Sequence, residues 1–132
     1  MQKSFPATLD NLKNIRLFLI NFLKDHKIEN KIIKEVELAV DEAASNIIKH
    51  AYIEENKNNV IKIELELKNR TFLIQLYDNG IEVDKNTIKP RSLDNVKPGG
   101  LGSHFINQIM DETKYLKSNK WINHLVMKKN IN

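Results

Sequence analysis

Residues 60–68 alternate between apolar and charged side chains, and this pattern limits the possible folds more than any other feature of the chain. Successive side chains of a strand point to opposite faces, so the pattern predicts a strand with one buried face and one wet face. Asn69-Arg70 predicts a short turn, and residues 71–77 predict the returning strand. A sheet with one apolar face needs a second layer to cover it. The apolar positions are Val60, Ile61, Ile63, Leu65 and Leu67, and the charged ones are Lys62, Glu64, Glu66 and Lys68.

Two amphipathic helices upstream can supply that layer. Apolar residues recur there at steps of three and four, the spacing of one helix face. The order of elements predicts an α+β fold, a two-layer α/β sandwich with helices on one face of a mainly antiparallel, mixed sheet. The predicted elements are an edge strand at 3–8, helices at 10–26, 29–52 and 99–110, and a terminal hairpin at 113–118 and 121–129.

Composition narrows the class of protein. A chain of 132 residues with 41% apolar side chains predicts one domain with a core of its own. No apolar run reaches about 18 residues, and the N-terminus lacks the apolar segment of a signal peptide. There is no cysteine, and the net charge of +4 is spread along the chain. We therefore expect a cytoplasmic protein without disulfides or thiolate zinc sites, and without direct binding to nucleic acid or membranes.

The second predicted helix carries a polar pair on one face. Glu42 and Asn46 are four residues apart and share that face, with His50 a further step along. An Asn oxygen suits Mg²⁺, and a nearby Glu can accept a proton from an attacking hydroxyl. The alternative is a solvated helix face, since such pairs are common.

The segment Asp78-Asn79-Gly80 ends the second central strand. A carboxylate there can accept a hydrogen bond from an exocyclic amine such as N6 of adenine. Gly80 lets a planar ring approach the backbone, because it has no Cβ. The alternative is an ordinary turn, in which these residue types are frequent.

Glycines gather before the third predicted helix. Gly99, Gly100 and Gly102 are three of the four glycines in the chain, and Gly80 is the fourth. Glycines at a helix N-terminus expose backbone N–H groups that can bind phosphate. The spacing fits neither a Walker A loop nor a Rossmann crossover, and a plain helix-starting loop remains the alternative. Residues 81–98 before it are polar and predict a long loop, a length that hints at function.

Together these segments resemble the GHKL ATPase superfamily, which shares the Bergerat nucleotide-binding fold. More narrowly, they resemble the anti-sigma factor serine kinases of the RsbW and SpoIIAB type, over nearly the whole chain. The fourth motif given below ends in Met110-Asp111-Glu112, and this ending is particularly similar to the same segment in the RsbW and SpoIIAB branch. The motifs that carry the resemblance are Glu42-x-x-x-Asn46 with His50, Asp78-x-Gly80-x-x-x-Asp84, Gly99-Gly100-Leu101-Gly102, and Ile106-x-x-Ile109-Met110-Asp111-Glu112.

The resemblance implies a role for each motif. Glu42 would be the general base for a serine hydroxyl, Asn46 would bind Mg²⁺, Asp78 would read adenine, and Gly80 would make room for it. Residues 81–98 would form the ATP lid. The remaining residues expected at the nucleotide are Lys49, His50, Asp84, Gly99, Gly100, Leu101, Gly102 and Ser103.

Two positions depart from the superfamily pattern. Glu82 stands where many members have a second glycine, although the anti-sigma branch often lacks it. Ser103-His104 follows the last glycine, where apolar residues are common. A polar pair there can contact phosphate or change how the lid docks.

The resemblance further implies a cytoplasmic ATP- and Mg²⁺-dependent kinase that works as a homodimer. Such a protein would hold a sigma factor inactive and phosphorylate a serine of a STAS-type anti-sigma factor antagonist. Phosphorylation adds nearly two negative charges, which would weaken the grip of the antagonist. The alternatives are a catalytically silent nucleotide-binding module that only sequesters a partner, a kinase of another partner-switching circuit, and a structural domain without a ligand.

Overall fold

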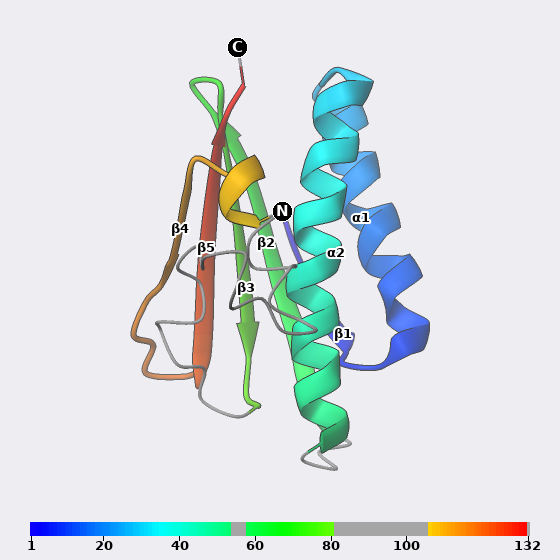
Figure 1. Cartoon of the computed structure of the whole chain (residues 1–132), viewed down its shortest axis with the longest axis vertical. Coiled ribbons are helices and arrows are strands. Elements are labelled where there is room, and N and C mark those ends of the chain that lie inside the picture. The colour runs from blue at the N-terminus through cyan, green and yellow to red at the C-terminus, as the bar shows by residue number, and fades with distance from the viewer. Residues whose placement is uncertain (54–57, 81–105, 132) are drawn as a thin grey trace, which may run out of the picture.

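The computed structural model describes residues 1–53, 58–80 and 106–131, and side chains are described there except at 50–53. Helices and strands form two layers (Figure 1). The helical elements are η1 (Leu9–Asn11), α1 (Leu12–Asp25) and α2 (Asn30–Ile53), with a further helical turn at 106–109. The strands are β1 (Gln2–Pro6), β2 (Val60–Lys68), β3 (Thr71–Asp78), β4 (Glu112–Tyr115) and β5 (Asn123–Asn130).

The strands form one sheet in the order β1-β2-β3-β5-β4, and all four pairings are antiparallel. The alternation of β2 sets which face is buried. Ile63 lies opposite Leu76, which lies opposite Leu125, and all three are buried. The α+β two-layer fold expected from the sequence is therefore confirmed, with β1 as an edge strand beside β2.

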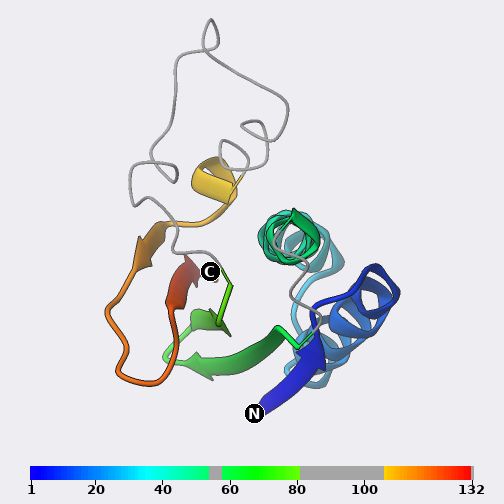
Figure 2. The same ribbon diagram turned by 90° about the horizontal axis from the view of Figure 1, so that it is seen from below.

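Helices α1 and α2 cover the same face of the sheet, as the view along the strands shows (Figure 2). The predicted apolar stripe of α1 is buried through Ile15, Leu19, Phe22 and Leu23. From α2 the core receives Val36, Ala39, Val40, Ala43 and Ile47, as the sequence predicts. Complete burial of a Val, Leu, Ile or Phe side chain stabilises the folded state by roughly 1.5–3 kcal/mol.

Two tight turns hold non-glycine residues in the left-handed region. Asn69 (φ 52°) and Arg70 (φ 63°) join β2 to β3, and positive φ at both central positions is the geometry of a type I′ hairpin turn. Lys27 (φ 57°) ends α1, where Ile28 N–H donates to Leu23 O at 3.1 Å. This bond closes the helix as in a Schellman motif.

Polar contacts join elements that lie far apart in sequence. The Arg16 guanidinium of α1 lies 2.8 Å from the Asp41 carboxylate of α2. Lys129 Nζ of β5 donates to Ile109 O at 2.8 Å and lies 3.6 Å from the Glu35 carboxylate of α2. One ammonium group thus ties the sheet to α2 and to the helical turn at 106–109.

The Met-Asp-Glu ending of the fourth motif has a structural function. Asp111 accepts a hydrogen bond from Asn130 N–H at 2.6 Å, and its own N–H donates to Lys128 O at 2.8 Å. Asp111 therefore fixes the start of β4 against the end of β5.

Some predicted boundaries differ from the structure. Helix α1 begins at Leu12, because residues 9–11 form the 3-10 turn η1. The predicted terminal hairpin is present, because β4 pairs antiparallel with β5, but its strands end earlier and begin later than predicted: β4 ends at Tyr115 and β5 begins at Asn123. The connection is held by hydrogen bonds from Lys120 N–H and Trp121 N–H to Ser118 Oγ. Of the predicted helix at 99–110, residues 106–109 are helical and 99–105 lie outside the described residues.

Within the described ranges, no helix is both long enough and apolar enough to span a membrane.

Candidate functional site

Polar side chains are buried at one place in the described part of the chain. The buried polar residues are Asn59, Asp78 and Asn123, with 3%, 4% and 5% exposure. They lie just before β2, at the end of β3 and at the start of β5, which is the lower end of the sheet in Figure 1. Buried polar groups cost free energy unless they are hydrogen-bonded, so a cluster of them at one edge of the sheet marks that edge as a candidate site.

Asp78 is fixed from two directions. Its Oδ1 accepts hydrogen bonds from Gly80 N–H at 2.8 Å and from Asn123 Nδ2 at 3.1 Å. Asn123 is also its direct partner in the β3–β5 register. A buried carboxylate held in this way offers an acceptor of fixed direction, which is what recognition of an amine requires.

The residue between Asp78 and Gly80 links three strand ends. Asn79 N–H donates to Asn59 Oδ1 at 3.0 Å, and Asn79 Oδ1 accepts from Ile122 N–H at 3.1 Å. The turn is therefore anchored to the segments that precede β2 and β5. Gly80 is itself buried, so a Cβ at this position would fill space beside Asp78.

Tyr115 of β4 extends this environment. Burial, and secondly the negative charge of Asp78, raise the pKa of the Tyr115 phenol to about 12. Tyr115 lies opposite Leu125, whose other neighbour is Leu76, so it belongs to the helix-facing side of the sheet. It remains a neutral hydroxyl near the carboxylate.

The second part of the predicted site is on α2. Glu42 and Asn46 are both half-buried, and Lys49 is exposed. The C-terminal half of α2 and the end of β3 lie at the same end of the molecule (Figure 1). His50 is within α2, and its side chain is outside the described residues.

The rest of the predicted site falls outside the part of the chain that the structure describes. Asp84, Gly99, Gly100, Leu101, Gly102 and Ser103, together with the predicted lid at 81–98, lie outside the described residues. In the parts that are described, no group of three or more His, Cys, Asp or Glu side chains could hold a metal ion.

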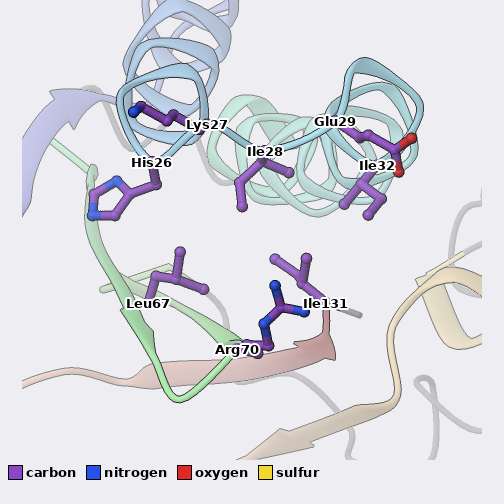
Figure 3. Close-up of a pocket in the computed structure, with 8 residues that line it drawn as sticks. All are labelled: His26, Lys27, Ile28, Glu29, Ile32, Leu67, Arg70 and Ile131. Atoms are coloured by element: carbon purple, nitrogen blue, oxygen red, sulfur yellow. The ribbon is translucent and has the colours of Figure 1, made fainter.

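A separate cavity lies at the opposite end of the sheet. It has a volume of about 340 Å³ and is formed by the α1–α2 junction, the β2–β3 turn and the end of β5 (Figure 3). Arg70 points into it among the apolar side chains of Ile28, Ile32 and Ile131. Because β3 separates Arg70 from Asp78, this cavity is distinct from the site at the strand ends.

Sequence reasoning missed three residues of the site. Asn59 and Asn123 occupy helix-facing positions in the alternation of β2 and β5, where the neighbouring positions Ile61 and Leu125 are apolar. An amide in such a position was the available signal. Tyr115 had no comparable signal, because β4 is short and its register comes from pairing with β5.

The fold and this edge of the sheet define a class of protein. A family model for the histidine kinase-like ATPase domain matches residues 5–129, and the chain belongs to this family. It is also similar to serine-protein kinases RsbW of Staphylococcus aureus, including strains RF122 and MRSA252. Each is 31% identical over 120 residues, covering 85% of this chain and 76% of the relative.

Solved structures agree on the fold. A chain of the SiaB–SiaC complex from Pseudomonas aeruginosa matches with a TM-score of 0.66 and 14% identity, covering 99% of this chain and 88% of that one. The nucleotide-free catalytic domain of histidine kinase ThkA matches with a TM-score of 0.60 and 10% identity, covering 99% and 97%. The solved structures show the fold, and the family model together with the 31% identical RsbW relatives confirms the resemblance inferred from the motifs.

Proposed function

We propose that this protein is an ATP-dependent serine protein kinase and anti-sigma factor. It would act as one histidine-kinase-like ATPase domain over residues 1–132, in the cytoplasm and as a homodimer. The observation that carries the proposal is the buried Asp78, held by Gly80 and Asn123 at the edge where the family implies a nucleotide. The similarity to serine-protein kinases supports a serine as acceptor.

The described residues fit an adenine nucleotide. Asp78 supplies a fixed acceptor for the exocyclic amine, and the missing Cβ of Gly80 leaves room beside it. The phosphates would be held by Gly99, Gly100, Leu101, Gly102 and Ser103, with Asp84, Lys49 and His50 near the nucleotide. Asn46 would hold Mg²⁺, an ion that keeps waters and takes few protein ligands beside phosphates.

Glu42 would carry the chemistry. Its carboxylate accepts the proton of a serine hydroxyl while the serine oxygen forms a bond to the γ-phosphorus. The bond from the γ-phosphorus to the bridging oxygen breaks, and ADP leaves with the electron pair. Bound Mg²⁺ would neutralise charge on the phosphates. The products are phosphoserine on the partner and ADP.

The partners are a sigma factor, which the protein would sequester, and a STAS-type antagonist, which it would phosphorylate. Unphosphorylated antagonist would compete for this protein and release the sigma factor. Phosphorylation adds nearly two negative charges and reverses that competition. The proposal includes no direct contact with nucleic acid or membrane.

Calorimetry and a transfer assay test the proposal together. ATP is titrated with and without Mg²⁺ into wild type, Asn46→Ala and Asp78→Asn. We expect Mg²⁺-dependent binding that both substitutions weaken. Radiolabelled ATP with a STAS-domain protein from the same organism should then give phosphoserine. A Glu42→Gln variant should bind ATP as the wild type does and lose transfer by a factor of at least about 100.

The outcomes separate the candidates. ATP binding without transfer to any STAS-domain protein of that organism would leave a nucleotide-binding module that acts by sequestration. No ATP binding by folded wild-type protein would overturn the kinase assignment.

A further inference from the structure

Asn59 carries a buried hydrogen-bond donor without a partner. The residue is 3% exposed, and its Nδ2 makes no hydrogen bond. Thr113 Oγ1 is the other such buried atom found in the described residues. A buried amide donor that stays unpaired costs free energy, so it needs a reason such as a missing ligand.

The orientation of this amide follows from its neighbour. Asn79 N–H donates to Asn59 at 3.0 Å, so the side-chain atom that faces it must be the oxygen. The NH₂ group therefore points elsewhere. Exchanging the amide oxygen and nitrogen would place two donors face to face, so the unpaired group is a donor rather than an acceptor.

The register places Asn59 beside the predicted base site. Lys62 lies opposite Tyr77, and continuing this antiparallel register sets Asn59 opposite Gly80. Asn59, Asp78 and Gly80 are all buried on the helix-facing side. The amide thus lies in the row next to Asp78, against the surface that Gly80 leaves without a Cβ.

A donor beside an acceptor matches one nucleobase edge. Adenine presents the N6 amine next to the ring acceptors N1 and N7, whereas guanine presents the acceptor O6 next to N1–H. Asn side chains read N6 and N7 of adenine through this combination of acceptor and donor. Here Asp78 would supply the acceptor and Asn59 the donor.

We propose that the Asn59 carboxamide donates a hydrogen bond to a ring nitrogen of bound adenine and so determines base specificity. This inference rests on the proposed nucleotide site and names a further residue within it. Asn59 acts on binding of the base and takes no part in phosphoryl transfer.

Atom-by-atom changes of the ligand test the proposal. Calorimetry compares ATP with its 1-deaza, 7-deaza and 3-deaza analogues on wild type and Asn59→Ala. Wild type should lose about tenfold or more in affinity for the 1-deaza or the 7-deaza analogue. The 3-deaza analogue is the matched control, because N3 lies away from N6. In Asn59→Ala the affinities for ATP and the sensitive analogue should become equal.

A structural role gives a different pattern. If Asn59 only anchors Asn79, Asn59→Ala would lower the affinity for ATP and for each of the three analogues by the same factor. The ratios of these affinities would then stay as in the wild type, which would overturn the inference. Thr113→Val removes the other unpaired buried group and should leave every affinity unchanged. If Asn59→Ala does not fold, the ¹⁵N signal of the Asn59 side chain in wild type decides. It should shift with ATP and shift less with the sensitive analogue.

These results also separate the two proposals. If the wild type binds ATP and binds all three deaza analogues with the same affinity as ATP, the role of Asn59 is overturned and the proposed nucleotide site remains. No ATP binding by wild type overturns both.

Discussion

Lys27 shows how a single backbone conformation limits stability. Its φ of 57° is left-handed, a region in which a Cβ costs roughly 1–2 kcal/mol. Glycine removes this strain but loses more entropy on folding. We therefore expect Lys27→Gly to raise the free energy of unfolding by up to about 1 kcal/mol, measured by urea denaturation. Lys34→Gly is the matched control and should lose about 1 kcal/mol, because Lys34 lies inside α2. A loss in both variants would contradict this reading of Lys27.

Single residues also show what the sequence reveals. Asp78 and Gly80 were predictable, because an acid and a glycine end an apolar strand and fit one ligand chemistry. Asn59 and Asn123 were missed, because the one local signal for them, an amide at a helix-facing position, does not show that both are buried beside Asp78. Their significance depends on which strands are neighbours, and the β3–β5 pairing joins residues 45 positions apart. Local patterns predict elements, whereas the site forms from long-range pairing.

At the scale of elements, local periodicity predicted β2, β3 and α2 closely. Apolar and charged residues alternate along β2 because one face of the sheet packs against the helices. The alternation in sequence follows the alternation in burial. The terminal hairpin was predicted from strands at 113–118 and 121–129 and is present as β4 and β5, but the connection between these strands is longer than predicted. Asn79 holds Ile122 N–H from outside the connection, and this contact cannot be read from the residues within it.

Lys129 contacts the helical turn at 106–109. This ammonium is largely buried, donates to Ile109 O and lies near Glu35. Lys129→Met keeps the aliphatic bulk but leaves the carbonyl without this donor, so we expect a loss of about 1–2 kcal/mol in unfolding free energy. Glu35→Gln should cost less than about 0.5 kcal/mol, because Glu35 is 40% exposed and 3.6 Å away. Urea denaturation of both variants measures these changes in unfolding free energy. Equal losses in the two variants would contradict a main contribution from the hydrogen bond to Ile109 O.

On the sheet face opposite the helices, the side chain of His124 joins β5 to β3. His124 Nε2 lies 2.7 Å from Gln75 Oε1, and its ring stacks on Tyr77 at 4.1 Å. Burial lowers the pKa of His124 below its ordinary value of 6.5, against the opposing effect of the Glu64 charge. At pH values between 6.5 and the lowered pKa of His124, the unfolded chain therefore binds more protons than the folded chain.

Stability should consequently fall as the pH drops from about 6.5 toward the lowered pKa of His124. His124→Gln cannot take up this proton, so its unfolding free energy should fall less over that range. Urea denaturation at a series of pH values between 7 and 5 measures the difference. The prediction would be contradicted if the unfolding free energy of the wild type depended on pH no more steeply than that of His124→Gln.

At the scale of the whole molecule, the proposed nucleotide site lies where a bound ligand would act on global stability. Asp78, Asn59 and Asn123 join the ends of β2, β3 and β5, so a ligand bound there connects strands from distant parts of the chain. A ligand that binds only the folded state stabilises it in proportion to RT ln(1 + [L]/Kd). Nucleotide binding should therefore raise the melting temperature of the entire sheet and its helices.

Base identity should decide the size of this effect. At 100 times its Kd, ATP is expected to add about 2.7 kcal/mol and to raise Tm by roughly 5–10 °C. GTP at the same concentration should give a much smaller shift, because its O6 would face the Asp78 carboxylate without a proton between them. Differential scanning calorimetry measures both, with Asp78→Asn as the variant that should narrow the difference. Equal shifts with ATP and GTP in the wild type would show that the buried edge of the sheet does not read the base.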